Sequence, residues 1–234
     1  GVNMLPAPSM IYLCPHCSGL IEQERWASLN THGARFWSDG RMIASMYPDG
    51  YQLILCPHCS NRLWMSELDE VDSWDKYYGE PSFGPDGEGG LMHIPHSKGY
   101  DQARQGKEPS FDDYMVELQE GVHDEEREGY LRQRAWWRGN DQRREGEQVP
   151  LSDQERDNLK QFLKMIDPSD DYWRVIAAEV NRELGQFQEA LRLLFDSVAR
   201  RHGSSVALIR ELCLMDNPFV AEVPTEDRGG IVLG

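Results

Sequence analysis

Basic side chains are scarce in this sequence relative to acidic ones. The 234 residues include 24 Lys and Arg against 40 Asp and Glu, which gives a formal net charge of −16. A protein that binds duplex nucleic acid through its phosphates needs a surplus of Lys and Arg to displace counterions. The charge balance therefore argues against broad, sequence-independent nucleic-acid binding.

A long hydrophobic run is also missing. No stretch approaches the roughly 20 apolar residues that cross a membrane as a helix, and residues 1–10 lack the basic and apolar segments of a secretory signal. We therefore expect a cytoplasmic protein without a membrane partner. With 39% hydrophobic and 10% aromatic residues, the chain still has enough apolar material for a folded core.

Sequence motifs of the common enzyme classes are absent as well. We find no phosphate-binding loop of the Walker A type, no Gly-x-Ser-x-Gly nucleophile turn and no His-Glu-x-x-His metal pair. The sequence gives no basis for assigning catalytic or cofactor-binding residues. These absences favour a non-enzymatic protein.

Three stretches of different composition divide the chain. Residues 1–68 show short apolar runs separated by turns, residues 69–110 form an acidic, Gly- and Pro-rich linker or long loop, and residues 111–234 carry apolar residues at helical spacing. In the first stretch, Asp39-Gly40 and Asp49-Gly50 separate apolar runs, which predicts a three-stranded antiparallel meander. The predicted fold class is α+β, a small antiparallel β domain followed by an all-α domain.

Start and stop signals bound the helices that we expect in the last stretch. Ser152 and Glu155 have the spacing of a capping box. Gly185 ends the following helix at a position that suits a left-handed cap. Between these signals, the apolar residues recur every three or four positions and predict amphipathic helices.

The sequence Cys-Pro-His-Cys occurs twice, at residues 14–17 and 56–59, with 38 residues (18–55) between the copies. Each tight turn can supply two thiolates, and together they complete a tetrahedron with metal–sulfur distances of about 2.3 Å. This spacing predicts one zinc ion held by Cys14, Cys17, Cys56 and Cys59. Because four thiolates leave no open coordination position, the predicted site is structural and not catalytic.

The paired motif resembles the knuckles of zinc-ribbon proteins, in which β-hairpins carry the two Cys-x-x-Cys turns. The resemblance covers about residues 10–68, and the long spacing implies extra strands between the turns. Together with the helical second half, the architecture is similar to that of small, uncharacterised bacterial zinc-ribbon proteins. His16 and His58 lie inside the turns and are expected to point to solvent.

Cys-Pro-His-Cys is also similar to the active-site motif of periplasmic disulfide oxidases, where the His and a helix N-terminus activate the first thiol. Here the motif is duplicated, and Ser18 to Ile21 suggests a turn and a strand in place of a helix. A thiol-disulfide oxidoreductase is therefore a second alternative. The fifth cysteine, Cys213, lies on an apolar helical stripe and is expected to be a buried free thiol.

One helical hairpin, at about residues 170–200, resembles a tetratricopeptide repeat. The resemblance rests on Ala178, Gly185, Phe187 and Ala190, and it departs from the family at Asn181, where an aromatic residue is preferred. No second copy is evident, whereas about three repeats are needed for a stable solenoid. The resemblance implies protein recognition, and an ordinary helical hairpin is an equally good interpretation.

Three residue groups are further candidates. His93 and His96 lie close together in the Gly-rich stretch, and Trp136-Trp137 is surrounded by arginines. We expect the histidines to be an accidental pair, and at least one tryptophan to bury and anchor its helix. A small aromatic and basic surface on the expected meander would comprise Arg35, Phe36, Trp37, Arg41 and Tyr51.

The leading functional hypothesis is a non-enzymatic protein-interaction or adaptor protein with one structural zinc. The first alternative is a nucleic-acid-associated zinc-ribbon factor that uses the aromatic and basic surface. The oxidoreductase is the second. The sequence does not identify the partner, the biological process or the oligomeric state.

Overall fold

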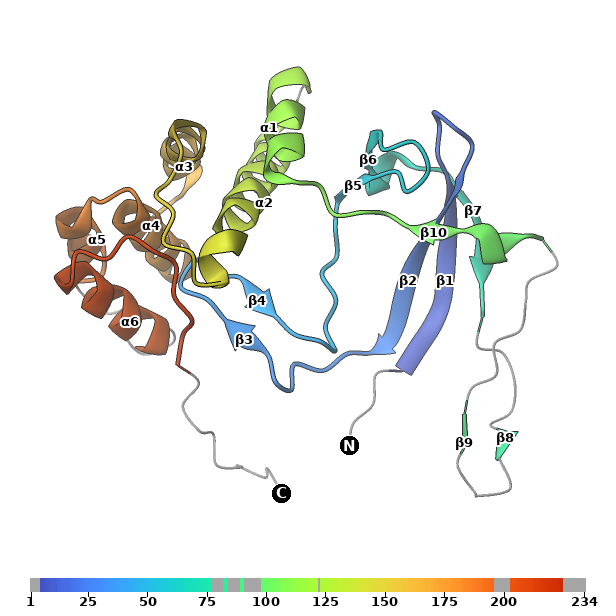
Figure 1. Ribbon diagram of the computed structural model, residues 1–234, viewed down its shortest axis with the longest axis horizontal. Helices are drawn as coiled ribbons and strands as arrows, with labels where there is room; N and C mark the ends of the chain where they lie inside the picture. Colours follow the sequence, from blue (N-terminus) through green and yellow to red (C-terminus); the bar gives the residue numbers. More distant parts are fainter. Residues whose placement is uncertain are drawn as a thin grey trace. The chain divides into compact units, whose positions relative to one another are not determined.

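The computed structural model describes residues 5–76, 98–121, 123–195 and 203–224, together with the backbone of 82–83 and 89–90. The chain forms two compact units. We call Gly1–His32 with Ser45–Pro109 the sheet unit, and Gly33–Ala44 with Ser110–Gly234 the helical unit. Strands dominate the first and helices the second, so the predicted α+β class is confirmed (Figure 1).

A four-stranded sheet with the order β10-β2-β1-β7 organises the sheet unit. Its strands are β1 (Leu5–Leu13), β2 (Leu20–Ser28), β7 (Glu70–Trp74) and β10 (Arg104–Gln105). β1 pairs antiparallel with β2 and β7, whereas β10 runs parallel to β2. A separate hairpin consists of β5 (Leu53–Leu55) and β6 (Arg62–Trp64). Smaller elements are η1 (Met65–Glu67), η2 (Tyr100–Gln102) and the pair β8 (Ser82–Phe83) and β9 (Gly89–Gly90).

The two faces of β1 enter different cores because successive side chains of a strand point to opposite sides. Ile11 packs with Trp74 and Tyr100 on one face. Tyr12 belongs to the opposite cluster, which contains two of the motif cysteines and comprises Met10, Tyr12, Cys14, Ile21, Ile54, Cys56 and Leu63. One cysteine of each turn, Cys14 or Cys56, is therefore part of a hydrophobic core.

The strand pairing differs from the expected meander. β3 (Arg35–Phe36) and β4 (Met42–Ile43) do pair as a hairpin, but β5 pairs with β6 and not with β4. The stretch 69–110, which composition predicts as a linker, supplies β7 and β10 to the sheet. Most residues of β7 are acidic or polar, and only Trp74 is buried. The alternation of apolar residues that indicates a strand is therefore missing from the sequence of β7. His93 and His96 lie outside the described residues.

Six helices form most of the described helical unit. They are α1 (Phe111–Glu120), α2 (Glu125–Arg144), α3 (Asp153–Met165), α4 (Asp171–Glu183), α5 (Phe187–Leu193) and α6 (Gly203–Leu214). The capping box at Ser152 and Glu155 is confirmed. Gly185 ends α4 with a φ of +79°, which confirms the predicted left-handed cap.

The β3–β4 hairpin belongs to the helical unit, although the sequence places it between the two cysteine motifs. Its turn residues Ser38 and Asp39 are buried. The chain after α6 adds to its edge, since Ser38 N donates to Ala221 O at 2.9 Å and Val223 N donates to Phe36 O at 2.8 Å. Gly40 has a φ of +81°, and a Cβ there would lie 2.8 Å from Ile176 Cδ1. The hairpin tip is thus packed closely and needs glycine.

No helix in the described part of the chain is both long and apolar enough to span a bilayer.

Candidate functional site

The two Cys-Pro-His-Cys turns have the same backbone structure. In the first, Ser18 N donates to Cys14 O at 2.9 Å, and in the second Ser60 N donates to Cys56 O at 2.9 Å. Both serines have a φ of 60°. Each turn connects two antiparallel strands, β1 to β2 and β5 to β6. Identical sequence therefore produces an identical knuckle at the end of each hairpin.

The four motif thiols converge. All four Sγ atoms lie within 4.8 Å of one another. The Cys14–Cys59 and Cys17–Cys56 sulfur pairs are each 3.8 Å apart. A tetrahedron with metal–sulfur bonds of about 2.3 Å has an edge of about 3.8 Å. The sulfur spacing therefore fits a metal ion at the centre of the cluster.

Amide groups donate hydrogen bonds to two of the motif sulfurs. Asn61 Nδ2 donates to Cys59 Sγ at 3.2 Å, and His58 N donates to Cys56 Sγ at 3.5 Å. The Asn61 amide groups lower the pKa of the Cys59 thiol to about 6, whereas burial raises the pKa of the Cys56 thiol. Four thiols this close cannot all ionise without a neighbouring positive charge. A divalent cation would supply that charge.

Both knuckle histidines are exposed, as predicted. His58 is nevertheless held in place, because its Nε2 lies 2.9 Å from Leu20 O. Its ring also covers Gly19, where a Cβ would lie 2.4 Å from His58 Cδ2. The second knuckle thus rests on the first through a His–Gly contact, which explains why a small residue follows Ser18.

Asn61 is the residue of this site that the sequence interpretation missed. It follows the second knuckle where Gly19 follows the first, and its side chain donates to a motif sulfur. A polar amide directly after a Cys-x-x-Cys-Ser turn is the only sequence signal for this role.

The interpretation of the site depends on its geometry alone. No known family, no curated protein and no solved structure matches this chain.

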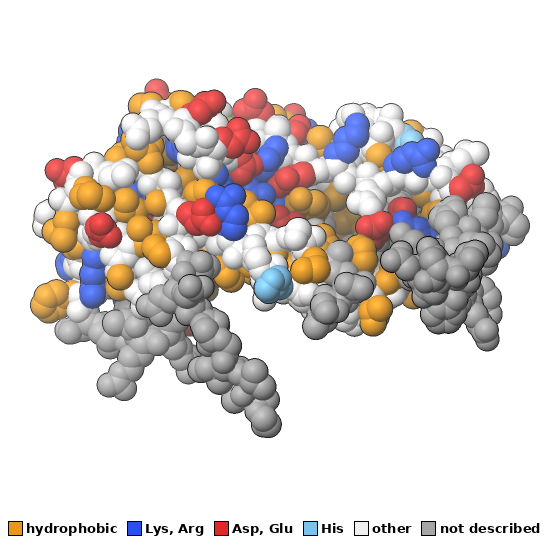
Figure 2. All heavy atoms as spheres, turned by 60° about the horizontal axis from the view of Figure 1, so that its bottom comes forward, with side chains coloured by type: hydrophobic (Ala, Val, Ile, Leu, Met, Phe, Trp, Pro, Cys, Tyr) orange, Lys and Arg blue, Asp and Glu red, His pale blue; other side chains and the backbone are white. Residues whose placement is uncertain are grey.

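The aromatic and basic surface expected on the meander does not form. Trp37 and Arg41 are buried in the helical unit, and Arg41 pairs with Asp141 at 2.6 Å. Arg35 pairs with Glu222 at 2.6 Å. Tyr51 packs against the cysteine core of the sheet unit. On the face shown in Figure 2, basic and acidic side chains are interspersed.

The two adjacent tryptophans anchor α2, as expected. Trp136 is buried and donates to Glu183 Oε2 at 2.9 Å, and Trp137 donates to Asp39 O at 3.0 Å. Cys213 is buried in the core of α4, α5 and α6, which confirms that prediction, and burial raises its pKa to about 11. A thiol in this state is inert.

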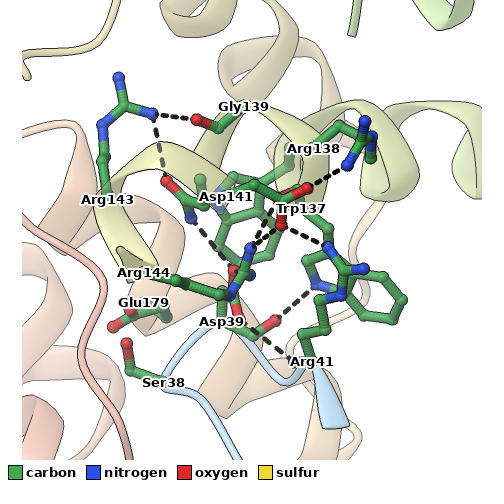
Figure 3. A network of polar contacts seen from close by, with 12 residues as sticks. Ser38, Asp39, Arg41, Trp137, Arg138, Gly139, Asp141, Arg143, Arg144 and Glu179 are labelled. Carbon is green, nitrogen blue, oxygen red and sulfur yellow. Dashed lines mark hydrogen bonds and ion pairs between the residues drawn. The ribbon is translucent and has the colours of Figure 1, made fainter. Parts of the chain in front are cut away.

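A buried polar network holds the hairpin tip against α2. Asp39 forms an ion pair with Arg144 and accepts from Asn140 Nδ2 at 3.1 Å, while Arg41 faces Asp141 (Figure 3). Asn140 Nδ2 also donates to Glu183 Oε1 at 3.0 Å. Asp39 and Asn140 are fully buried. Because its central residues Asp39 and Asn140 are enclosed by protein, the network does not offer a reactive surface.

Within this network, Glu183 should make the stability of the helical unit depend on pH. Burial and the nearby charge of Glu179 raise the pKa of Glu183 from 4.5 to about 8. The folded state therefore binds a proton that the unfolded chain releases near pH 4.5. The stabilising contribution is complete below that pH and is lost as the pH rises through about 8.

We expect urea unfolding between pH 6 and 9 to show a free energy of unfolding that falls by up to about 1.4 kcal/mol per pH unit. Glu183→Gln should flatten this slope, since the amide does not titrate. Glu189→Gln, at an exposed position, is the control and should keep it. If the Glu183→Gln slope equals the wild-type slope, another group is responsible.

Proposed function

We propose that the protein is a non-enzymatic adaptor whose sheet unit is a zinc ribbon with one structural zinc ion. The proposal rests on one observation: four thiols from two identical knuckles converge with the edge length of a zinc–thiolate tetrahedron. Cys14, Cys17, Cys56 and Cys59 would fill all four coordination positions. The ion would then fix the two hairpins to each other and would supply no catalytic position.

Two features favour this proposal over the disulfide oxidoreductase. The 3.8 Å sulfur pairs join cysteines of different knuckles, whereas a redox motif pairs the cysteines of one turn. Each knuckle also continues into a strand, β2 or β6, so no helix N-terminus lowers the pKa of its first thiol. A reduced four-thiolate site suits a reducing compartment such as the cytoplasm.

The adaptor role is supported by the helical unit. Ala178 of α4 and Ala190 of α5 are fully buried in a core that they share with α6, which is compatible with the proposed tetratricopeptide-like hairpin. Several large apolar side chains nearby remain exposed. These are Phe195 at 77%, Leu214 at 76% and Met215 at 58%. A partner that covered these side chains would remove apolar surface from water, which favours association.

Metal content and partner capture test the two parts of the proposal separately. Protein purified without chelator should contain one zinc per chain, and four of its five thiols should become reactive only after chelation. In extracts of the source cells, the tagged full chain should retain a reproducible partner. The double variant Leu214→Asp, Met215→Asp should lose this partner. The variant should keep its zinc and its melting temperature, which shows that it is folded.

A metal-free protein with disulfides within each knuckle would overturn the zinc proposal. Retention of the partner by the double variant would show that the α6 end is not the binding surface. Absence of any stoichiometric partner would contradict the adaptor role.

A further inference from the structure

A small pocket opens in the helical unit. It has a volume of about 90 Å³ and lies between the end of α2, the start of α3, the end of α4 and the chain after α6. Its apolar walls are Pro150, Leu151, Pro218 and Phe219. None of its residues belongs to the cysteine cluster, so the pocket is a candidate site independent of the proposed zinc.

The two arginines that line the pocket differ in their partners. Arg143 is fully engaged, because it pairs with Glu155 at 2.7 and 3.1 Å and its guanidinium also donates to three backbone carbonyls. Arg156, on the first turns of α3, is half-buried, and its guanidinium has no side-chain partner within the described ranges of the chain. Arg156 therefore gives the pocket a positive charge that forms no ion pair with the acidic side chains that the structure describes.

The third charged residue of the pocket, Glu183, does not cancel that charge. Both of its carboxyl oxygens accept hydrogen bonds, from Asn140 and Trp136. Around it lie Asp39 of the hairpin and Glu179 and Arg182 of α4. Because burial and Glu179 raise its pKa to about 8, Glu183 is protonated at neutral pH. A neutral carboxyl does not repel a bound anion.

Size restricts the ligand further. An engineered cavity of about 150 Å³ holds benzene, which has six heavy atoms. By that ratio the pocket, with about 90 Å³, encloses about four heavy atoms, and because it is partly open a fifth can lie at its mouth. Apolar walls on most sides and one unpaired cation among the described lining residues suit a monoanion with a short hydrocarbon part better than a dianionic phosphate.

We propose that this pocket binds a carboxylate on a short aliphatic stem, with the carboxylate on Arg156 and the stem against Leu151 and Phe219. Such a group is provided by a free short-chain acid such as acetate or propionate, and equally by an aspartate side chain on a protein partner. This inference goes beyond the adaptor proposal and does not depend on zinc binding.

The test is an NMR titration of the full-length, metal-loaded chain at pH 6.5. Acetate and propionate should shift the Leu151 methyl signals and the Trp136 indole N–H signal with dissociation constants no tighter than the micromolar range, since a ligand of so few atoms gains at most about 1.5 kcal/mol per heavy atom. Propionamide, which has the same shape without charge, should bind at least tenfold more weakly. A capped pentapeptide with a central Asp, compared with its Asn counterpart, probes the protein source.

Two variants of α3 make the test specific. Arg156→Gln should weaken propionate binding at least tenfold. Lys160→Gln removes an exposed cation of the same helix and should leave binding unchanged. Selective binding of the Asp peptide would identify a partner's side chain as the occupant, and binding of the free acids alone would identify a small molecule. Equal binding of propionamide, an equal response to sodium chloride, or wild-type affinity in Arg156→Gln would each overturn the proposal.

Discussion

Removal of the proposed zinc ion should unfold the sheet unit. Cys14 and Cys56 are fully buried in its core, so the proposed ion would link the knuckle hairpins directly to the packing around Tyr12 and Ile54. Structural zinc sites contribute about 10–16 kcal/mol of binding free energy at neutral pH, which is comparable to the total stability of a typical domain, about 5–15 kcal/mol. The apo sheet unit is therefore not expected to remain folded.

Hydrogen exchange with mass spectrometry can localise this effect. After chelation, and equally in Cys56→Ser, amides of β1, β2, β5 and β6 should lose their protection, while those of α3 and α4 keep most of theirs. Cys213→Ser is the matched control, because it removes the remaining cysteine, which lies outside the cluster. It should retain one zinc and a protected sheet. Full protection of β1 in Cys56→Ser would show that the fold does not depend on the metal.

Glu179→Ala should destabilise the helical unit by about 3–5 kcal/mol, because it leaves a buried arginine without its counter-charge. Arg182 binds Glu179 through Nε at 2.8 Å and Nη2 at 2.5 Å, and both side chains are completely buried. Within the described residues, the other hydrogen bond of the Arg182 guanidinium goes to the Asn217 carbonyl, which cannot neutralise the charge. Glu183 also lies near Arg182, but its raised pKa keeps it largely neutral below about pH 8.

The chain contains a matched control for this substitution. Arg192 binds Glu189 with the same spacing and the same two distances, 2.8 and 2.5 Å, but the side chains are 68% and 41% exposed. Glu189→Ala should therefore cost at most about 0.5 kcal/mol. Chemical denaturation followed by circular dichroism gives both values. Similar costs for the two variants would show that burial does not determine the strength of these pairs.

The metal-binding cluster could be predicted because all four cysteines are marked by a repeated local sequence. The helix caps at Ser152 and Gly185 could be predicted for the same reason, since each depends on neighbours within a few residues. Asp39 was recognised only as a turn residue. Its burial depends on Arg144 and Asn140, about a hundred positions away, and no local pattern reports such a partnership.

The strands of the acidic stretch were missed for a related reason. A half-buried strand is recognised by alternating apolar residues, but β7 buries only Trp74 and leaves Val71 exposed. Pairing with β1 determines its conformation. The same limit applies to Glu183 and Arg156: the sequence shows two charged residues, and only the fold shows that one is enclosed and the other faces a pocket.

The position of the β3–β4 hairpin has a consequence for biosynthesis. Ser38 and Arg35 are made 183 and 187 residues before their partners Ala221 and Glu222. Until α2 and residues 221–223 have been synthesised, the hairpin cannot form its native contacts, and Trp37, which is buried in the folded unit, stays uncovered. The helical unit therefore reaches its native state only after residue 223 has left the ribosome, and a fragment that begins at residue 110 would lack the hairpin that packs against α2.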